Sequence, residues 1–409
     1  MLISKVEFSK LISILLDQGF TSIVSFYTTV VISRVSSISD YAEFVLLMSI
    51  SVSILGFQRA LISQPYIINR NDFKIKEAKE YFYSNLWFKS IFTLALVVLI
   101  PSLIWIDKSI DSSRLILLFT SFIIFYSSFY FVKDMLLGNR ETLLNLKFSL
   151  FVNFSLAAIL SYILIKGEDK ISFFLIGASV VYLLAYVFFN LRNRSFLKFN
   201  RSKLLTMFKL NWKVGKWIAG SNLLFTVSSQ IYPWLLLWFM SKSDIAIYGV
   251  LISISSLVNP ILASLKAYLL PIFSKTSRNK FKLKKLVLKW VVFFCTMSFC
   301  LILVGELLGE QIIELFFGKK YSGLGYLVLL PFLDQAISIL FQPLDIAFNA
   351  LKRTDIGFRL LIFRSACALV LGFILVKQFG LVGVFATRIS ENILYQCANL
   401  VLFKRIMKT

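Results

Sequence analysis

The sequence contains no histidine among its 409 residues. This absence excludes serine–histidine catalytic pairs, histidine metal sites and histidine-based pH switches. The four cysteines, Cys295, Cys300, Cys367 and Cys397, lie in apolar runs without a CxxC spacing, so we interpret them as packing residues. No GxxxxGK[ST] sequence is present, which excludes a P-loop ATPase. We therefore expect no metal site, no cofactor and no catalytic residue, and a protein that is not an enzyme.

Charged residues are also scarce, and acidic ones are half as common as basic ones. Charged residues make up 16% of the chain, against about 25% in typical soluble proteins. Hydrophobic residues make up 58%, and the mean hydropathy is +0.80. This composition excludes an ordinary soluble enzyme, a disordered chain and a disulfide-rich scaffold. It predicts an all-α integral membrane protein that crosses the bilayer several times.

Apolar stretches of membrane-spanning length recur along the whole chain. A transmembrane helix needs about 20 mostly apolar residues. The connections between the apolar stretches are short, so no inserted soluble domain is expected. Twelve spans are expected, at residues 11–33, 41–66, 81–105, 114–136, 145–165, 171–191, 217–240, 245–273, 290–308, 324–351, 358–376 and 381–402.

The basic residues predict how these spans are oriented. If the N-terminus is cytoplasmic, 30 of the 44 Lys and Arg residues fall in cytoplasmic segments. An excess of Lys and Arg in short loops marks the cytoplasmic side of a membrane protein. Both termini are therefore expected in the cytoplasm. The net charge of +23 is explained by this topology, and no nucleic acid partner is expected.

The two halves of the sequence resemble each other at a nearly constant offset. Asp17 falls opposite Asn222, the segment 39–42 (SDYA) aligns with 243–246 (SDIA), and 161–166 (SYILIK) aligns with 372–377 (GFILVK). Each half has an even number of spans, so both copies share one orientation. We expect two six-helix bundles related by a parallel pseudo-two-fold axis along the membrane normal, with the substrate site between them. The expected domains are 1–191, a basic cytoplasmic linker at 192–216, and 217–409.

Three segments carry a resemblance to a known family. The first is DIAIYGVLISISSLVNPILASLKAYLLPIFSK at 244–275, and the second is LLGEQIIELFFGKKYSGLGYLVLLPF at 307–332. The third is NALKRTDIGFR at 349–359, followed by KQFGLVGVFATRISE at 377–391. Together with the number and order of spans, they resemble the O-antigen flippase (Wzx-like) family. That family belongs to the superfamily of multidrug, oligosaccharidyl-lipid and polysaccharide exporters.

The resemblance implies a flippase for an undecaprenyl-pyrophosphate-linked oligosaccharide, such as an O-antigen unit of lipopolysaccharide. It would move this substrate from the cytoplasmic to the periplasmic leaflet by alternating access. The implied location is the bacterial cytoplasmic (inner) membrane, with membrane lipids and the polymerase and chain-length proteins of the pathway as further partners. Two other functions stay open, a cation-coupled multidrug exporter of the same fold and a membrane-bound polysaccharide polymerase.

Basic residues inside the expected spans are the first candidates for substrate binding. Arg59 and Lys266 lie in the second and eighth spans, which are equivalent in the repeat, shortly before Pro65 and Pro271. Two basic groups across a cleft suit a pyrophosphate, whereas the alternative is that both side chains snorkel to the membrane surface. Lys89 lies near its helix start and is expected to snorkel.

The eleventh and twelfth spans add three further charged candidates. Arg364 is equally compatible with a substrate-binding and a structural role. Arg388 and Glu391 lie three residues apart on one helix face, which favours an internal ion pair between them. A role of Arg388 in substrate binding and of Glu391 in coupling to a proton stays open.

Polar stripes mark helix faces that lipid would reject. In the tenth span the stripe consists of Asp334, Ser338, Gln342, Asp345 and Asn349, at spacings of three and four residues. Such a face lines either a wet, substrate-binding cavity or a polar seam between helices. Asn222 in the seventh span is a further substrate-binding candidate, and Asp17 in the first span is a candidate for coupling.

Overall fold

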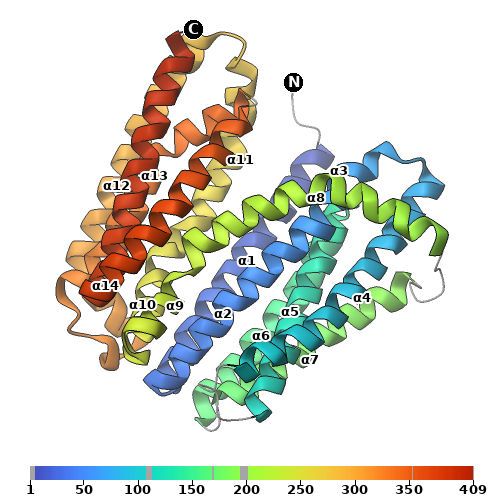
Figure 1. The fold of residues 1–409 in the computed structure, drawn as a ribbon, viewed down its shortest axis with the longest axis horizontal. Helices are drawn as coiled ribbons and strands as arrows, with labels where there is room; N and C mark the ends of the chain where they lie inside the picture. The colour runs from blue at the N-terminus through green and yellow to red at the C-terminus, as the bar shows by residue number, and fades with distance from the viewer. Residues whose placement is uncertain (1–4, 107–112, 168–169, 194–200, 352, 409) are drawn as a thin grey trace. The chain divides into compact units, whose positions relative to one another are not determined.

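The computed structural model describes residues 5–106, 113–167, 170–193, 201–351 and 353–408, and the regular elements in these ranges are helical (Figure 1). The first half contains α1 (Lys5–Val35), α2 (Ile38–Gln58), the π-helix η1 (Arg59–Ser63), α3 (Gln64–Asn69), the 3₁₀ turn η2 (Arg70–Asp72), α4 (Ile75–Ile106), α5 (Ser113–Gly138), α6 (Thr142–Lys166) and α7 (Lys170–Asn193). The second half contains α8 (Arg201–Gln230), α9 (Tyr232–Phe239), α10 (Lys242–Ser255), the 3₁₀ turn η4 (Ser256–Val258), α11 (Asn259–Thr276), α12 (Lys280–Phe317), the 3₁₀ turns η5 (Lys319–Tyr321) and η6 (Gly325–Val328), α13 (Leu329–Ala350) and α14 (Thr354–Lys408).

Within the described residues, ten helical stretches are long and apolar enough to cross a membrane. One of them, Ile356–Met407, is 52 residues long and contains Gly380 with a φ of 56°, so it is two helices joined at a kink. The seventh expected span corresponds to α8 and α9, where basic residues lower the hydropathy of α8. The all-α membrane fold expected from the sequence is confirmed, and the expected twelve spans are compatible with these helices.

Among the described residues, the helices of the second, seventh and eighth expected spans are interrupted. The seventh span is divided between α8 and α9. The second span changes to a π-helix at Arg59–Ser63, and the eighth passes through a 3₁₀ turn at Ser256–Val258. Proline occupies the first turn of α9 and of α11. The N–H groups of a first turn have no partner within the helix, so the N–H that proline lacks costs no helical hydrogen bond there. Pro343, by contrast, lies inside the continuous helix α13.

The stretch expected as a linker is largely helical. From Arg201 onward it forms the first half of α8, which packs across unit 1. The buried Asn211 of α8 accepts a hydrogen bond from Tyr81 and donates one to Asn85, both on α4. Gly215 allows a close approach, because a Cβ there would lie 2.8 Å from the carbonyl oxygen of Ala60.

The chain divides into two compact units. Unit 1 comprises residues 1–36 and 47–223, and unit 2 comprises residues 37–46 and 224–409. In unit 1, α1 packs on α6, and α5 packs on α7 and α4. Its interior contains an aromatic cluster in which Tyr182 contacts Phe122, Tyr126 and Phe129 at ring-centroid distances of 5.2–6.1 Å.

Unit 2 is built around α13, which packs on α11, α12 and α14. Two glycines of α12 bring it close to the segment that begins α13. A Cβ at Gly305 would lie 2.6 Å from the ring of Phe332, and a Cβ at Gly309 would lie 2.5 Å from Val328. The first residues of α2 belong to this unit, where Glu43 binds Lys242 at 2.7 Å.

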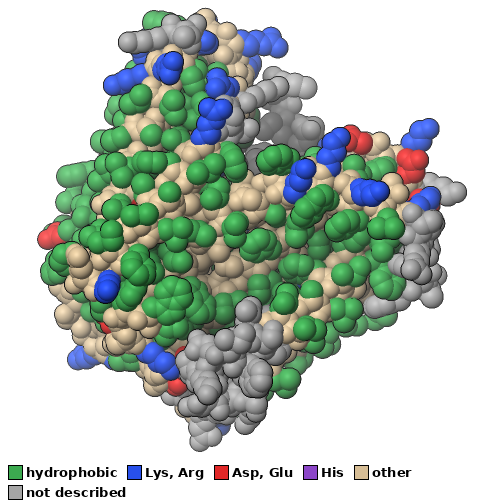
Figure 2. Space-filling model, viewed as in Figure 1, with side chains coloured by type: hydrophobic (Ala, Val, Ile, Leu, Met, Phe, Trp, Pro, Cys, Tyr) green, Lys and Arg blue, Asp and Glu red, His purple; other side chains and the backbone are tan. Residues whose placement is uncertain are grey.

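The surface agrees with a membrane environment. Large hydrophobic side chains are exposed on most helices, and Figure 2 shows them covering much of the visible face. Lys and Arg side chains are few on this face and stand apart from one another among the hydrophobic side chains (Figure 2). An exposed apolar surface of this extent is expected where lipid replaces water.

Candidate functional site

Arg59, a predicted substrate-binding residue, forms an ion pair inside unit 1. Its Nε lies 3.0 Å from Oδ2 of Asp134, and its Nη2 lies 3.3 Å from Oδ1. The guanidinium carbon also lies 5.3 Å from the ring centre of Tyr130. The Arg59 side chain nevertheless stays 37% exposed, so the guanidinium is held in a fixed direction and remains accessible.

A second ion pair in unit 1 joins Asp17, the predicted coupling residue, to Lys133 of α5. The Lys133 ammonium lies 2.9 Å from Oδ1 of Asp17, and both side chains are buried. Asn145 donates a hydrogen bond to the other carboxylate oxygen at 3.0 Å. The ammonium also donates to Thr21 and Ser149, each at 3.1 Å. Both oxygens of Asp17 and the Lys133 charge therefore have partners within unit 1.

The expectation that Lys89 snorkels is wrong. Lys89 is fully buried, and its ammonium nitrogen lies 2.7 Å from Oε1 of Gln58 and 2.8 Å from Oγ of Ser127. The Gln58 amide in turn donates to the carbonyl of Ser127 at 2.9 Å, which fixes the orientation of its oxygen. Helix packing brings these acceptors within hydrogen-bond distance of the amine, so the side chain points inward.

Unit 2 contains a comparable cluster on α13 and α14. Arg388 contacts Oδ2 of Asp334 through Nε at 2.9 Å and through Nη2 at 2.8 Å. Asn392, one turn further along α14, donates to Oδ1 of Asp334 at 3.1 Å and to Oγ of Ser338 at 2.7 Å. The Arg388 guanidinium also faces the ring of Tyr232 at 5.5 Å.

The ion pair expected between Arg388 and Glu391 is not the one that forms. Glu391 instead binds Arg364, whose Nη2 lies 3.1 Å from Oε1 of the carboxylate. Glu391 is fully buried, whereas 26% of the Arg364 side chain is exposed. Arg388 thus pairs with an acid of α13, and Glu391 pairs with an arginine from the first half of α14, because helix packing brings these partners together.

The polar stripe of α13 forms a seam with the second half of α14. Besides Asp334 and Ser338, Asp345 takes part, because its Oδ1 accepts hydrogen bonds from Tyr395 at 3.3 Å and Asn399 at 2.9 Å. Gln342 lies on another side of α13, where its amide reaches the carbonyl of Leu262 at 3.5 Å. Part of the stripe is therefore a polar seam within unit 2, and a role of the same residues in substrate binding stays a prediction.

The last two predicted substrate-binding residues have different surroundings. Asn222 on α8 donates to the carbonyl oxygen of Gly56 on α2 at 2.7 Å, so it joins two helices of unit 1. Lys266 on α11 is exposed. Arg59 belongs to unit 1 and Lys266 to unit 2, and their joint action on one phosphate group stays a prediction.

Three partners in these clusters were not identified from the sequence. Lys133 and Asp134 lie near the end of the fourth expected span, 114–136, and are not among the candidate residues of the sequence analysis. Gln58 was overlooked because only charged residues of the second span were considered. Their signal was available in the sequence, since Lys133 and Asp134 follow a stretch of apolar residues without a break. In the described residues, no three Cys, Asp or Glu side chains are grouped as a metal site would require.

The comparison with protein families decides the family of this chain. A family described as "Polysaccharide biosynthesis protein" matches residues 31–324. The chain belongs to the polysaccharide biosynthesis protein family. The comparison with curated proteins gives no match. The family resemblance noted in the sequence is thereby confirmed at this level.

Solved structures of transporters share the fold of this family member. An inward-facing multidrug resistance MATE family transporter of the MOP superfamily has a TM-score of 0.75 at 14% identity, over 96% of this chain and 94% of its own. The lipid II flippase MurJ, in an inward closed conformation, has a TM-score of 0.72 at 16% identity, over 97% of this chain and 87% of its own. A mutant of the MATE transporter VcmN of Vibrio cholerae has a TM-score of 0.66 at 16% identity, over 98% of this chain and 96% of its own. The chain therefore shares the fold of these MOP superfamily transporter structures.

Proposed function

We propose that this family member is a flippase for undecaprenyl-pyrophosphate-linked oligosaccharide, the lipid-linked repeat unit of a polysaccharide such as O-antigen. It would carry the sugar headgroup from the cytoplasmic to the periplasmic leaflet of the inner membrane by alternating access. A sugar headgroup cannot cross hydrocarbon unaided, because its hydroxyl groups would lose their hydrogen bonds to water. Membership in the polysaccharide biosynthesis family and the transporter fold support this proposal.

The observation that carries the proposal is the Arg59 guanidinium. Asp134 holds it through Nε and Nη2, and the side chain remains 37% exposed within a membrane-length helical stretch. A fixed and accessible guanidinium suits a phosphate oxygen, because its donors are arranged as a planar fork. We assign Arg59 and Lys266 to the pyrophosphate, and Arg364 remains a further candidate for substrate binding. Arg388, Asn222 and the α13 residues Asp334, Ser338, Gln342 and Asp345 would shape the polar surroundings of the sugars, and Asp17 and Glu391 remain the candidates for coupling.

A second function has a specific observation in its favour. The multidrug transporter structure matches this fold over nearly the whole chain, with a TM-score of 0.75. A cation-coupled drug exporter would bind cationic compounds, for which exposed basic residues are unfavourable. Removing the charges of Arg59 and Lys266 should therefore leave drug export intact and abolish oligosaccharide flipping.

The test is the sidedness of lipid-linked oligosaccharide in cells depleted of this protein. We expect complete units to accumulate on the cytoplasmic face and wild-type protein to relieve the accumulation. An Arg59→Met/Lys266→Met variant that also carries Asp134→Asn should not relieve it. The Asp134→Asn change avoids leaving an unpaired carboxylate inside unit 1, which would otherwise confuse loss of function with loss of folding.

The matched control is Lys209→Met, which removes an exposed basic side chain on α8 outside the clusters and leaves the pair of Arg59 and Asp134 intact. Relief by this control but not by the Arg59 and Lys266 variant supports both the function and the site. Relief by both variants retains the flippase and rejects the site. Normal sidedness in depleted cells that have no second flippase overturns the proposed function and favours the drug exporter.

A further inference from the structure

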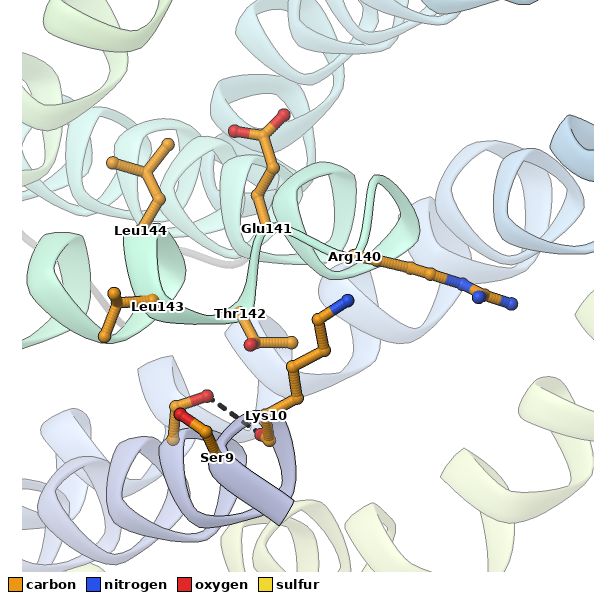
Figure 3. Close-up of a pocket in the computed structure, with 8 residues that line it drawn as sticks. Ser9, Lys10, Arg140, Glu141, Thr142, Leu143 and Leu144 are labelled. Carbon is orange, nitrogen blue, oxygen red and sulfur yellow. Dashed lines mark hydrogen bonds between the residues drawn. The ribbon is translucent and has the colours of Figure 1, made fainter. Parts of the chain in front are cut away.

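A cavity in unit 1 lies apart from the ionic clusters. Its volume is about 520 Å³, and we call it the turn pocket. It is lined by Ser9, Lys10 and Ser13 of α1 and by residues 140–144, which form the turn between α5 and α6 and the start of α6 (Figure 3). In this view the Lys10 side chain extends from α1 toward that turn, while the Glu141 carboxylate points away from it.

The charges around the turn pocket favour an anion. Lys10 and Arg140 are its two basic side chains, and Glu141 is its one acidic side chain. Glu141 lies 3.9 Å from Arg192 of α7, which offsets its negative charge. The Ser13 hydroxyl donates to the carbonyl of Lys10 at 2.8 Å, so its proton is not available to a ligand. The two basic side chains and the hydroxyl groups of Ser9 and Thr142 are the other donors of the lining.

Arg140 has a backbone conformation that normally selects glycine. Its φ is 61°, and it stands where α5 ends. Its N–H donates to the carbonyl of Leu137, and the next N–H donates to the carbonyl of Leu136, both at 2.9 Å, as in a Schellman turn. A side chain with a Cβ is strained in this conformation. The arginine therefore weakens the turn relative to glycine, and its exposed guanidinium offers a reason for its presence.

The position of the turn pocket along the helices matches the level of lipid headgroups. Three candidate spans begin or end next to its lining, at Ile12, Gly138 and Thr142. Leu143, which is 58% exposed, and Leu144 provide an apolar wall beside the cations. Basic groups at the end of a span, next to exposed apolar side chains, match the phosphate and the acyl chains of one phospholipid.

We propose that the turn pocket binds the phosphate group of an anionic membrane phospholipid. Lys10, which extends toward the turn, contacts the phosphate oxygens, and the exposed Arg140 guanidinium, which extends away from Lys10 in Figure 3, adds positive charge at the edge of the pocket. Leu143 contacts the upper part of an acyl chain. This lipid is distinct from the transported cargo, so the site stands whether or not the flippase function is correct.

The test is native mass spectrometry of the full-length protein in neutral detergent, titrated with dioleoylphosphatidylglycerol. We expect one saturable lipid to bind more tightly than dioleoylphosphatidylcholine. Lys10→Gln and Arg140→Gly should each weaken its binding by about fivefold, because one basic group near a lipid surface contributes about that factor. Arg140→Gly is the sharper variant, because it relieves the strained turn and should preserve or raise the melting temperature while lowering lipid affinity.

The matched control is Lys166→Gln, which removes an exposed cation at the other end of α6. It should bind phosphatidylglycerol as the wild type does. Unchanged affinity in both pocket variants overturns the proposal, and so does equal binding of the two lipids. Displacement of the lipid by millimolar inorganic phosphate shows that the pocket takes a free phosphate, which rejects the phospholipid as its ligand.

Discussion

At the scale of single residues, the Lys133 ammonium and the Asp17 carboxylate are the most completely surrounded charges of unit 1. They lie 2.9 Å apart, and Asn145, Ser149 and Thr21 satisfy their remaining hydrogen bonds. Taking two charges out of water is costly, so such a pair persists only when each partner neutralises the other. The pair and its hydrogen bonds therefore connect α1, α5 and α6, and removing one charge alone leaves the other unpaired.

Asp17→Asn should destabilise the protein by about 3–5 kcal/mol, because it leaves the Lys133 charge buried without an anion. Asp17→Asn/Lys133→Met should recover most of this loss, since neither charge then remains. Thermal unfolding of the purified protein in detergent measures both variants. A double variant that unfolds as early as the single one would show that Asp17 stabilises the fold through contacts other than Lys133.

At the scale of elements, α14 depends on two glycines that join its halves. Gly380 has a φ of 56°, which separates the eleventh from the twelfth span. Gly383 lies where a Cβ would overlap the backbone carbonyl of Leu375. The two halves of α14 approach each other at this point by backbone contact, which only glycine allows.

Gly383→Ala should lower the melting temperature strongly, because the added methyl group meets backbone that cannot move aside. A loss of about 4 kcal/mol or more is expected for an overlap of this kind. Gly357→Ala on the same helix is the matched control, since a Cβ there meets nothing within 4 Å. The control should be neutral or stabilising by about 1 kcal/mol. Equal melting temperatures for the two variants would contradict the close approach at Gly383.

At the scale of the whole molecule, the distribution of charge sets the proposed orientation in the membrane. Lys and Arg gather in segments such as 274–289, whereas the segments assigned to the other side carry few. The bilayer retains basic loops on the cytoplasmic side. The spans expose apolar side chains, which suit lipid. The connecting segments are therefore the parts expected to contact water.

We predict that Lys74→Cys and Lys280→Cys are labelled only from the cytoplasm, and Lys166→Cys and Lys319→Cys only from outside. The background is the chain with its four native cysteines replaced by alanine. Labelling of intact cells with a membrane-impermeant maleimide distinguishes the two sides, and labelling after lysis is the control for reactivity. Labelling of Lys74→Cys in intact cells would reverse the proposed orientation.

The number and the order of the spans could be predicted because each depends on nearby residues. Apolar length decides whether a segment crosses a bilayer, and basic flanks decide its direction. The candidate site was predictable only in part, because Arg59, Arg388 and Asp334 are recognisable as charged residues in apolar runs, whereas the sequence does not show which residues they pair with.

Partner choice was decided by tertiary structure. Spacing alone favoured Arg388 with Glu391, but α13 brings Asp334 to Arg388, and the packing of α14 brings Arg364 to Glu391. The position of Lys89 near its helix start favoured snorkelling, but in the structure its ammonium binds Gln58 of α2 and Ser127 of α5 inside unit 1. The sequence by itself determined that this is a basic, many-spanning helical membrane protein, since solvation acts on each segment separately. Only the tertiary structure decided which buried charges meet, because a hydrogen bond depends on distances of a few ångströms between helices far apart in the chain.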